Sequence, residues 1–146
     1  IRKNKNYLAR HNMEMINGSV RQKPGPGNSL GLVKFLFPNS YNIYLHDTPA
    51  KSLFNETSRA FSHGCIRLAE PRKLALYLLE GNKDWPVDKI DKTMKGGKET
   101  WVTLPQTIPV FIGYFTAWVD SEGLLNFRDD IYGHDKKMAE QLFGER

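Results

Sequence analysis

The sequence lacks several features that would assign a protein to a class at once. It has a single cysteine among 146 residues, which excludes an internal disulfide or a site built from several thiolates. It has no apolar run of the roughly 20 residues that a membrane-spanning helix requires, and no internal repeat or low-complexity block. A disulfide scaffold, a helical membrane domain and a repeat protein are therefore excluded for this stretch.

The chain also lacks an initiating methionine and a basic leader followed by an apolar segment. It begins at Ile1, and the residues that follow are mostly polar. A secreted precursor would begin with such a leader. We therefore expect the sequence to be a processed or excised piece of a longer protein.

What the sequence does contain is sufficient for a folded domain. Hydrophobic residues make up 40% and aromatic residues 12% of the chain, and this length is ordinary for one domain. We expect residues 1–146 to form a single domain. The net charge of +5 favours anionic partners such as nucleic acid, lipid head groups or a carboxylate-rich polymer, without choosing among them.

The first third of the chain is typical of strands and loops. Asn17-Gly18, between two strand-like segments, is a strong hairpin signal. The Pro- and Gly-rich residues 23–31 predict a loop. Alternating apolar residues then predict a strand at 33–37 and a returning strand at 41–46.

The returning strand carries two side chains of chemical interest. Tyr44 and His46 are two residues apart, so they share one face of the strand. A phenol is therefore expected one pleat away from an imidazole at the strand end. Such a pair suits the wall of a binding site.

The rest of the chain alternates between helices and strands. Pro71 suits the first turn of a helix that Gly81 ends, and the spacing of apolar residues predicts a second helix that begins near Asp84. The pattern as a whole indicates a mixed α/β, β-rich domain. The later predicted segments are strands at 101–104, 108–119 and 124–127 and a helix at 135–143.

The single cysteine lies in the most informative stretch, from Ser62 to Arg67. A thiol with an ordinary pKa of about 8.5 is mostly protonated at neutral pH, and a neighbouring imidazole that accepts its proton creates the nucleophilic thiolate. His63 lies two residues before Cys65, and His46 lies 19 residues before it on a predicted strand. The spacing alone does not decide between these histidines.

Gly64 directly precedes the candidate nucleophile. Glycine permits a close approach of the backbone and unusual dihedral angles. The amides of Gly64 and Cys65 are therefore candidates for an oxyanion hole, which stabilises the negative charge that develops when a thioester forms.

Two other interpretations of these residues stay open on chemistry alone. In the first, Cys65 is a packed small residue and the histidines are incidental. In the second, His46, His63 and Cys65 bind zinc, although His-x-Cys is not a usual pair spacing for that metal.

A family resemblance distinguishes these possibilities. His46, a gap of 15 residues and then Ser62-His63-Gly64-Cys65 is similar to the histidine-to-SHGC signature of YkuD-type L,D-transpeptidases. The runs 21–31 and 45–49 resemble the large periplasmic branch of that family in Gram-negative bacteria. The similar segments cover residues 19–80, with weaker similarity to the end of the chain.

The resemblance implies a fold and a set of roles. It implies a YkuD-type, β-sandwich-like sheet core with short flanking helices, in a piece that lacks upstream strands and any lid or wall-binding region. Cys65 becomes the acylated nucleophile and His46 the proton acceptor and donor, with His63 as an orienting neighbour and the Gly64 amide in the oxyanion hole. A backbone carbonyl beside the imidazole, that of Asp47 or a neighbour, is expected to orient it, which leaves the Asp47 side chain incidental. The expected substrate-binding residues are Tyr44, Ser62 and Arg67.

The resemblance also implies a reaction. Cys65 attacks the carbonyl between diaminopimelate and the terminal D-Ala of a tetrapeptide stem, D-Ala leaves, and a diaminopimelate amine of a second stem discharges the thioester. No metal or organic cofactor takes part. The implied partners are peptidoglycan stem peptides and carbapenem inhibitors, not nucleic acid. The implied location is the periplasm, with the full-length protein anchored to the inner membrane and working with other cell-wall synthases.

Several points remain open within the resemblance. Many family members have Asn where this chain has Arg67, so the last position of the motif is less diagnostic. The acceptor rests on the branch resemblance alone: water would make the enzyme an L,D-carboxypeptidase or endopeptidase, and a lipoprotein lysine would make it an attachment enzyme. A catalytically silent peptidoglycan-binding module is the alternative from another class, which the presence of both Cys65 and His46 opposes.

Overall fold

The structure is a computed structural model that describes residues 6–62 and 64–144. It divides into two compact units, residues 1–107 and residues 108–146, which we describe separately. The expectation of a single domain over residues 1–146 is not tested by this division and stays a prediction. No helix within the described ranges is long and apolar enough to cross a membrane.

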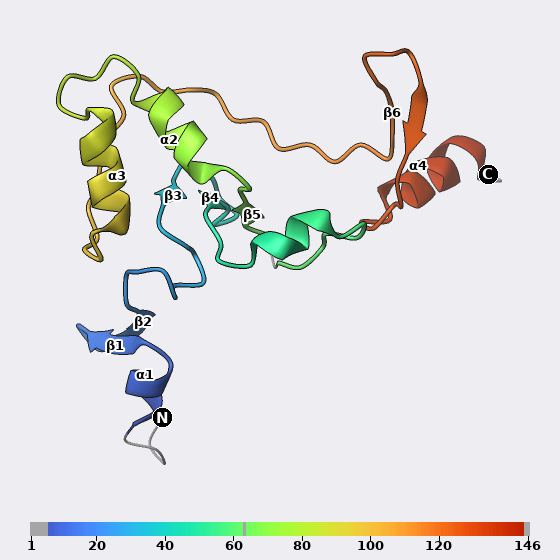
Figure 1. The fold of residues 1–146 in the computed structure, drawn as a ribbon. Coiled ribbons are helices and arrows are strands. Elements are labelled where there is room, and N and C mark those ends of the chain that lie inside the picture. Colours follow the sequence, from blue (N-terminus) through green and yellow to red (C-terminus); the bar gives the residue numbers. More distant parts are fainter. Residues whose placement is uncertain (1–5, 63, 145–146) are drawn as a thin grey trace. The chain divides into compact units, whose positions relative to one another are not determined.

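The first unit opens with a short helix and a hairpin. α1 spans Tyr7–Arg10, and β1 (Met13–Ile16) pairs antiparallel with β2 (Ser19–Gln22) (Figure 1). Asn17 and Gly18 between them have φ angles of 50° and 79°. Two positive φ angles characterise the type I′ turn, and Asn-Gly adopts it readily. The predicted hairpin is confirmed.

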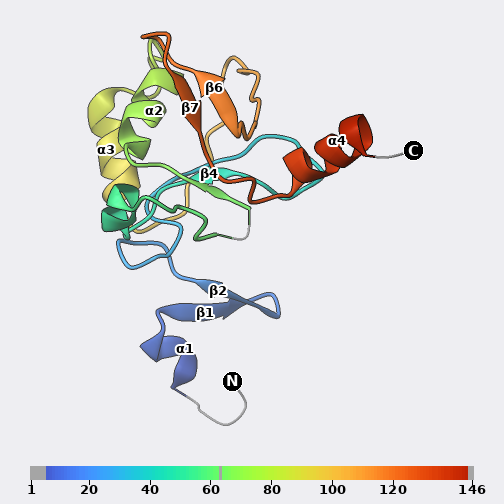
Figure 2. The same ribbon diagram turned by 90° about the vertical axis from the view of Figure 1, so that its right-hand side faces the viewer.

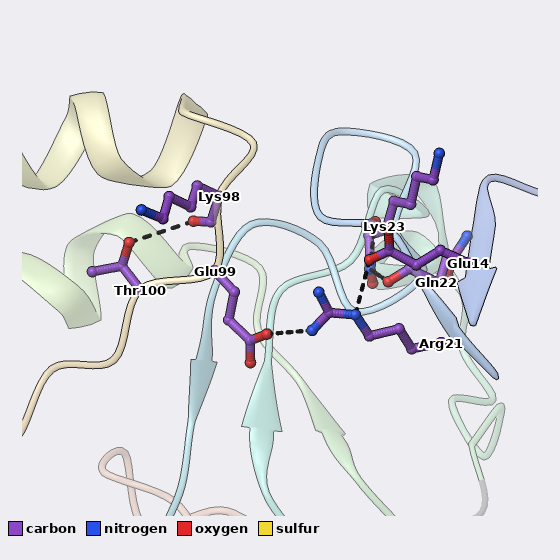
Figure 3. A network of polar contacts seen from close by, with 8 residues as sticks. Glu14, Arg21, Gln22, Lys23, Lys98, Glu99 and Thr100 are labelled. Atoms are coloured by element: carbon purple, nitrogen blue, oxygen red, sulfur yellow. Dashed lines mark hydrogen bonds and ion pairs between the residues drawn. The ribbon is translucent and has the colours of Figure 1, made fainter. Parts of the chain in front are cut away.

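Ion pairs connect the hairpin to a distant segment of the same unit. Arg21 of β2 donates to Glu14 of β1 at 2.9 Å and to Glu99 at 2.6 Å, and Figure 3 shows the guanidinium between the two carboxylates. The three side chains are 31–45% exposed, and exposed pairs contribute little to stability. The network therefore mainly specifies where the hairpin attaches.

Residues 23–33 form an irregular segment between β2 and β3, in agreement with the predicted loop. The Gln22 side chain accepts a hydrogen bond from the Ser29 amide at 2.9 Å and donates one to the Gly27 carbonyl at 3.0 Å. Such bonds satisfy backbone groups that have no partner in a helix or strand.

A three-stranded sheet forms the centre of the first unit. β3 (Lys34–Phe35) pairs antiparallel with β4 (Leu45–His46), and β4 pairs parallel with β5 (Ile66–Arg67). The strands predicted at 33–37 and 41–46 are thus present, but they are much shorter than predicted.

The Asn39 side chain explains why these strands are short. Its amide donates to the carbonyls of Phe37 at 3.0 Å and Ile43 at 2.7 Å, and its oxygen accepts from the Ile43 amide at 3.0 Å. Local side-chain bonds of this kind compete with ladder hydrogen bonds. Asn42, with a φ of 55°, turns the chain further, so β3 and β4 are joined by a wide loop.

Two helices supply the core of the first unit. α2 (Pro71–Leu78) and α3 (Val87–Lys95) lie beside each other in both views (Figures 1 and 2). Pro71 occupies the first turn of α2, as predicted, because the missing N–H of proline costs nothing there. Ala75, Leu79 and Ile90 are buried between the helices. Both predicted helices are confirmed.

The strand predicted at 101–104 is wrong. Val102 and Leu104 pack against the helical core while Trp101 is 74% exposed, so burial alternates as it does in a strand. No strand among the described residues pairs with this segment, and without ladder hydrogen bonds alternation does not make a strand.

The second unit contains a hairpin and a helix. β6 (Ala117–Val119) pairs antiparallel with β7 (Leu125–Phe127), and α4 spans His134–Phe143. The predicted strand at 124–127 and the C-terminal helix are confirmed. Of the strand predicted at 108–119 only the last three residues are present, because proline and glycine interrupt its first part.

The described elements confirm the predicted fold class. The structure is mixed α/β, with small sheets and a few short helices. The three-stranded sheet is the part that carries the candidate catalytic residues.

Candidate active site

The register of the three-stranded sheet brings the candidate residues to one face. His46 is the antiparallel partner of Lys34 and the parallel partner of Arg67. Paired residues share a face of a sheet, and so do residues two apart on one strand. The side chains on this face are those of Lys34, Tyr44, His46, Cys65 and Arg67.

The helical core lies on the opposite face of the sheet. Phe35 directly follows Lys34 in β3, so its side chain lies on the other face of the sheet. There it packs against the core of α2 and α3. The Ile66 amide donates to the Tyr44 carbonyl at 3.0 Å, and the Leu68 amide donates to the His46 carbonyl at 2.9 Å. Neighbouring parallel strands therefore carry the candidate base and nucleophile.

His46 is held tightly at the end of β4. It is only 4% exposed, and its Nδ1 bonds to the backbone carbonyl of Asp47. Because a carbonyl only accepts, Nδ1 carries the proton and Nε2 is left as an acceptor. The expected orientation of the imidazole by the Asp47 carbonyl is confirmed. A neutral imidazole with a free Nε2 is able to accept the proton of a thiol.

Cys65 lies directly before β5 and is partly buried. Its Sγ donates a weak hydrogen bond to the Asn42 carbonyl oxygen at 3.8 Å. Within the described contacts no hydrogen bond joins Sγ to His46, which lies diagonally across the two strands. Catalytic hydrogen bonds often tighten only when substrate binds.

Tyr44 is the side chain that contacts both candidate catalytic residues. Its ring centroid is 5.8 Å from that of His46, which confirms that the two share a face. Burial raises the pKa of Tyr44, and the hydrogen bond and charge of Cys65 raise that pKa further. The phenol therefore stays protonated near neutral pH and is able to donate a hydrogen bond to a thiolate at Cys65.

The residues just before Cys65 form the turn that leads into it. Gly64 has a φ of 146°, a conformation that other residues rarely adopt, and among the described residues a Cβ there would contact Ile43 at 3.9 Å, an ordinary van der Waals distance. The Ser62 hydroxyl donates to the Cys65 carbonyl at 2.7 Å, so in this structure it supports the turn. The oxyanion role of Gly64 and the substrate contact of Ser62 stay predictions, and His63 lies outside the described residues.

Two cations flank His46 on the sheet face. Arg67 is partly buried and makes no ion pair with another described residue. The Lys34 Nζ lies 5.5 Å from the centroid of the Tyr44 ring. Positive charge on both sides of the imidazole suits a substrate with carboxylates. Sequence reasoning missed Lys34, because its proximity to His46 depends on strand pairing.

Lys51 is a second residue that sequence reasoning missed. Its ammonium bonds to the Asp47 carboxylate at 2.7 Å, and the Asp47 side chain, expected to be incidental, is nearly buried and also accepts from the Leu32 amide at 2.9 Å. Neither of these partners is His46, so the expectation that this side chain is incidental to catalysis stays a prediction. The spacing of four residues was a weak signal, since it favours ion pairs only within a helix.

Neither a metal cluster nor a cavity defines this site. Among the described residues no group of three or more His, Cys, Asp or Glu is arranged to hold a metal, and the zinc alternative needs His63, which is outside them. A cavity of about 480 Å³ lies among the loop after β2, the two helices and residues 97–104, and Cys65 and His46 do not line it. The chemistry of the sheet face therefore identifies the site.

Comparisons with known proteins point to one family. A family model described as the L,D-transpeptidase catalytic domain, YkuD, matches residues 1–90, which include the sheet and every candidate residue. A Haemophilus influenzae protein named "Putative L,D-transpeptidase" is 39% identical over 119 residues, which cover 82% of this chain and 24% of that protein. The chain therefore spans about a quarter of the length of this curated relative.

Proposed function

The chain belongs to the YkuD family of L,D-transpeptidase catalytic domains, and from this premise we propose that it cross-links peptidoglycan stem peptides with Cys65 as nucleophile and His46 as base. The observation that carries the proposal is the shared sheet face. Tyr44 lies on it with its ring 5.8 Å from that of His46 and with its pKa raised by Cys65, and His46 Nε2 has no hydrogen-bond partner among the described residues.

The first half of the proposed reaction forms an acyl-enzyme. His46 Nε2 accepts the thiol proton, and the sulfur of Cys65 attacks the carbonyl carbon between diaminopimelate and the terminal D-Ala of a tetrapeptide stem. The carbonyl oxygen becomes an oxyanion, for which the amides at Gly64 and Cys65 are the candidate donors. When the tetrahedral intermediate collapses, the C–N bond breaks, and His46 gives its proton to the departing amine of D-Ala.

The second half transfers the acyl group. A side-chain amine of diaminopimelate on another stem attacks the thioester carbonyl, His46 takes a proton from that amine, and the C–S bond breaks to return the thiol. The product is a cross-link between two diaminopimelate residues. Metal ions and organic cofactors have no part in the proposed scheme.

The charges around the site support an anionic substrate. The stems carry free carboxylates, and Arg67 and Lys34 lie on the two sides of His46. We include Arg67 as a substrate-binding residue for a carboxylate of the donor or acceptor stem. We further propose that the enzyme works in the periplasm and is acylated by carbapenems, and that the full-length protein is tethered to the inner membrane near other cell-wall synthases.

Product analysis tests the proposed acceptor. Incubation of the complete protein with purified disaccharide tetrapeptide is expected to release D-Ala and to yield dimers with a cross-link between two diaminopimelate residues, because an amine attacks a thioester far more readily than water does. Mass spectrometry of the separated products provides the measurement. Tripeptides without dimers would instead establish the runner-up, an L,D-carboxypeptidase that uses water.

A Tyr44→Phe variant tests the role of the phenol. It is expected to lower kcat/KM for the tetrapeptide by roughly 10- to 150-fold, because a hydrogen bond from the phenol to a charged thiolate is worth roughly 1.5–3 kcal/mol. The matched control is Tyr41→Phe, since Tyr41 is 80% exposed and should tolerate the change. Unchanged turnover in Tyr44→Phe would show that Tyr44 only packs against His46.

A further inference from the structure

The Lys51 ammonium joins the two strands that carry the proposed catalytic residues. It donates to Asp47 Oδ1 at 2.7 Å, to the Leu68 carbonyl at 3.0 Å and to the Ala69 carbonyl at 3.0 Å. An ammonium has three N–H donors, so each of them has a partner. Asp47 follows β4, and the two carbonyls follow β5, so that one side chain holds both strand ends.

Asp47 is a firm anchor for this ammonium. Its side chain is 9% exposed, and its second oxygen accepts from the Leu32 amide at 2.9 Å. Burial raises the pKa of the carboxyl, but hydrogen bonds from Lys51 and from the amides of Leu32 and Thr48, with the charge of Lys51, outweigh burial and hold that pKa below its ordinary value. The carboxylate therefore stays ionised at neutral pH and keeps its partners.

The backbone of Asp47 connects the ion pair with Lys51 to the imidazole of His46. Its amide donates to the Val33 carbonyl at 2.9 Å, and its carbonyl accepts from His46 Nδ1. Gly31 packs so close that a methyl group there would overlap the Asp47 side chain. Asp47 is thus fixed at its amide, its carbonyl and its carboxylate.

We propose that Lys51 is a positioning residue that orients His46 relative to Cys65, by tying the Asp47 anchor to the end of β5. Leu68 completes the connection, because its amide bonds to the His46 carbonyl at 2.9 Å while its own carbonyl bonds to Lys51. The inference rests on the proposed function in one respect, that His46 is the base for Cys65. An ordinary surface ion pair would leave the reaction unaffected.

Kinetics of a Lys51→Met variant of the complete protein test this inference. The methionine keeps the aliphatic stem and removes the three donors. We expect kcat to fall by roughly 10²-fold, the loss that a misplacement of about 1 Å causes, with KM within a factor of about three, because Lys51 does not contact substrate. The matched control is Lys73→Met, which removes an equally short 2.6 Å pair with Glu70 on the surface of α2 and should leave both constants unchanged.

A spectroscopic signature separates positioning from a loss of stability. In protein labelled with ¹⁵N-histidine, the Nδ1–H of buried His46 should give an imidazole resonance protected from exchange, identified by its absence in His46→Gln. We expect it in the wild type and in Lys73→Met, and expect it to be shifted or broadened beyond detection in Lys51→Met. Wild-type kcat in folded Lys51→Met, or an unchanged resonance, would overturn the inference.

A second variant keeps the test decisive if Lys51→Met does not fold. Lys51→Arg retains the charge, but its planar guanidinium cannot place donors on the same three oxygens as the ammonium does. A reduced kcat with a shifted His46 resonance supports positioning, whereas wild-type values would assign Lys51 to folding alone and overturn it. The His46 resonance is measured without substrate, so it reports the position of the imidazole even if the enzyme is inactive. A wild type that forms no acyl-enzyme would therefore contradict the proposed function, and the resonance would still show whether Lys51 positions His46.

Discussion

A Cys65→Ala variant is expected to form no acyl-enzyme and to lose transpeptidase turnover by roughly 10⁴-fold or more, as the removal of a catalytic nucleophile does in other acyl-transfer enzymes. The chain holds no second thiol, so no other residue can replace the sulfur. The measurement is the intact mass of the complete protein after exposure to meropenem. The wild type should gain the mass of one carbapenem molecule, and Cys65→Ala should gain none.

The control for this experiment is the substitution of a small polar residue in the exposed segment before the nucleophile. Ser58→Ala removes a hydroxyl from an exposed residue and should acquire the adduct as the wild type does. Absence of an adduct on the wild type, or an adduct that survives in Cys65→Ala, would refute the assignment of the nucleophile.

Loss of the base should be nearly as severe. His46→Ala is expected to slow acylation by about 10²–10⁴-fold, the contribution typical of general acid–base catalysis, because it removes the proposed proton acceptor. Time-resolved mass spectrometry of adduct formation measures the rate. His63→Ala should impair acylation without abolishing it, in keeping with an orienting role.

His11 provides a matched control for the histidine variants. Its Nδ1 also bonds to a backbone carbonyl, that of Tyr7 at 2.8 Å, but it lies in α1's C-terminal turn, away from the sheet face. His11→Ala should acylate at the wild-type rate. Equal and complete loss in His46→Ala and His63→Ala would leave the base unassigned and remove the present reason for preferring His46.

Local signals in the sequence predicted the local structure well. Asn17-Gly18 gave the hairpin turn, because its two positive φ angles depend on these residues alone. Pro71 gave the start of α2 for a similarly local reason. The sharing of one face by Tyr44 and His46 follows from the two-residue period of a strand, and their ring contact confirms it.

Features that depend on distant partners were not predictable in this way. The segment 101–104 has the alternating burial of a strand but no pairing partner among the described residues. The partners of the Asp47 side chain, the Leu32 amide and Lys51, could not be predicted because only the folded backbone brings them to it. Strand pairing likewise placed Lys34 beside His46. The two-residue period of a strand predicts which face of the sheet carries a side chain, but only the pairing of strands determines which side chains lie beside it.

The parallel pairing of β4 with β5 has a consequence for how such a site can diversify. The separation of His46 and Cys65 is set by backbone hydrogen bonds between two adjacent strands, while the exposed residues 56–61 merely connect η1 (Lys51–Asn55) to the turn before Cys65. Doubling the length of a flexible connection costs only about 0.6 kcal/mol. This connection is therefore expected to tolerate changes of length and sequence without altering the separation of His46 and Cys65.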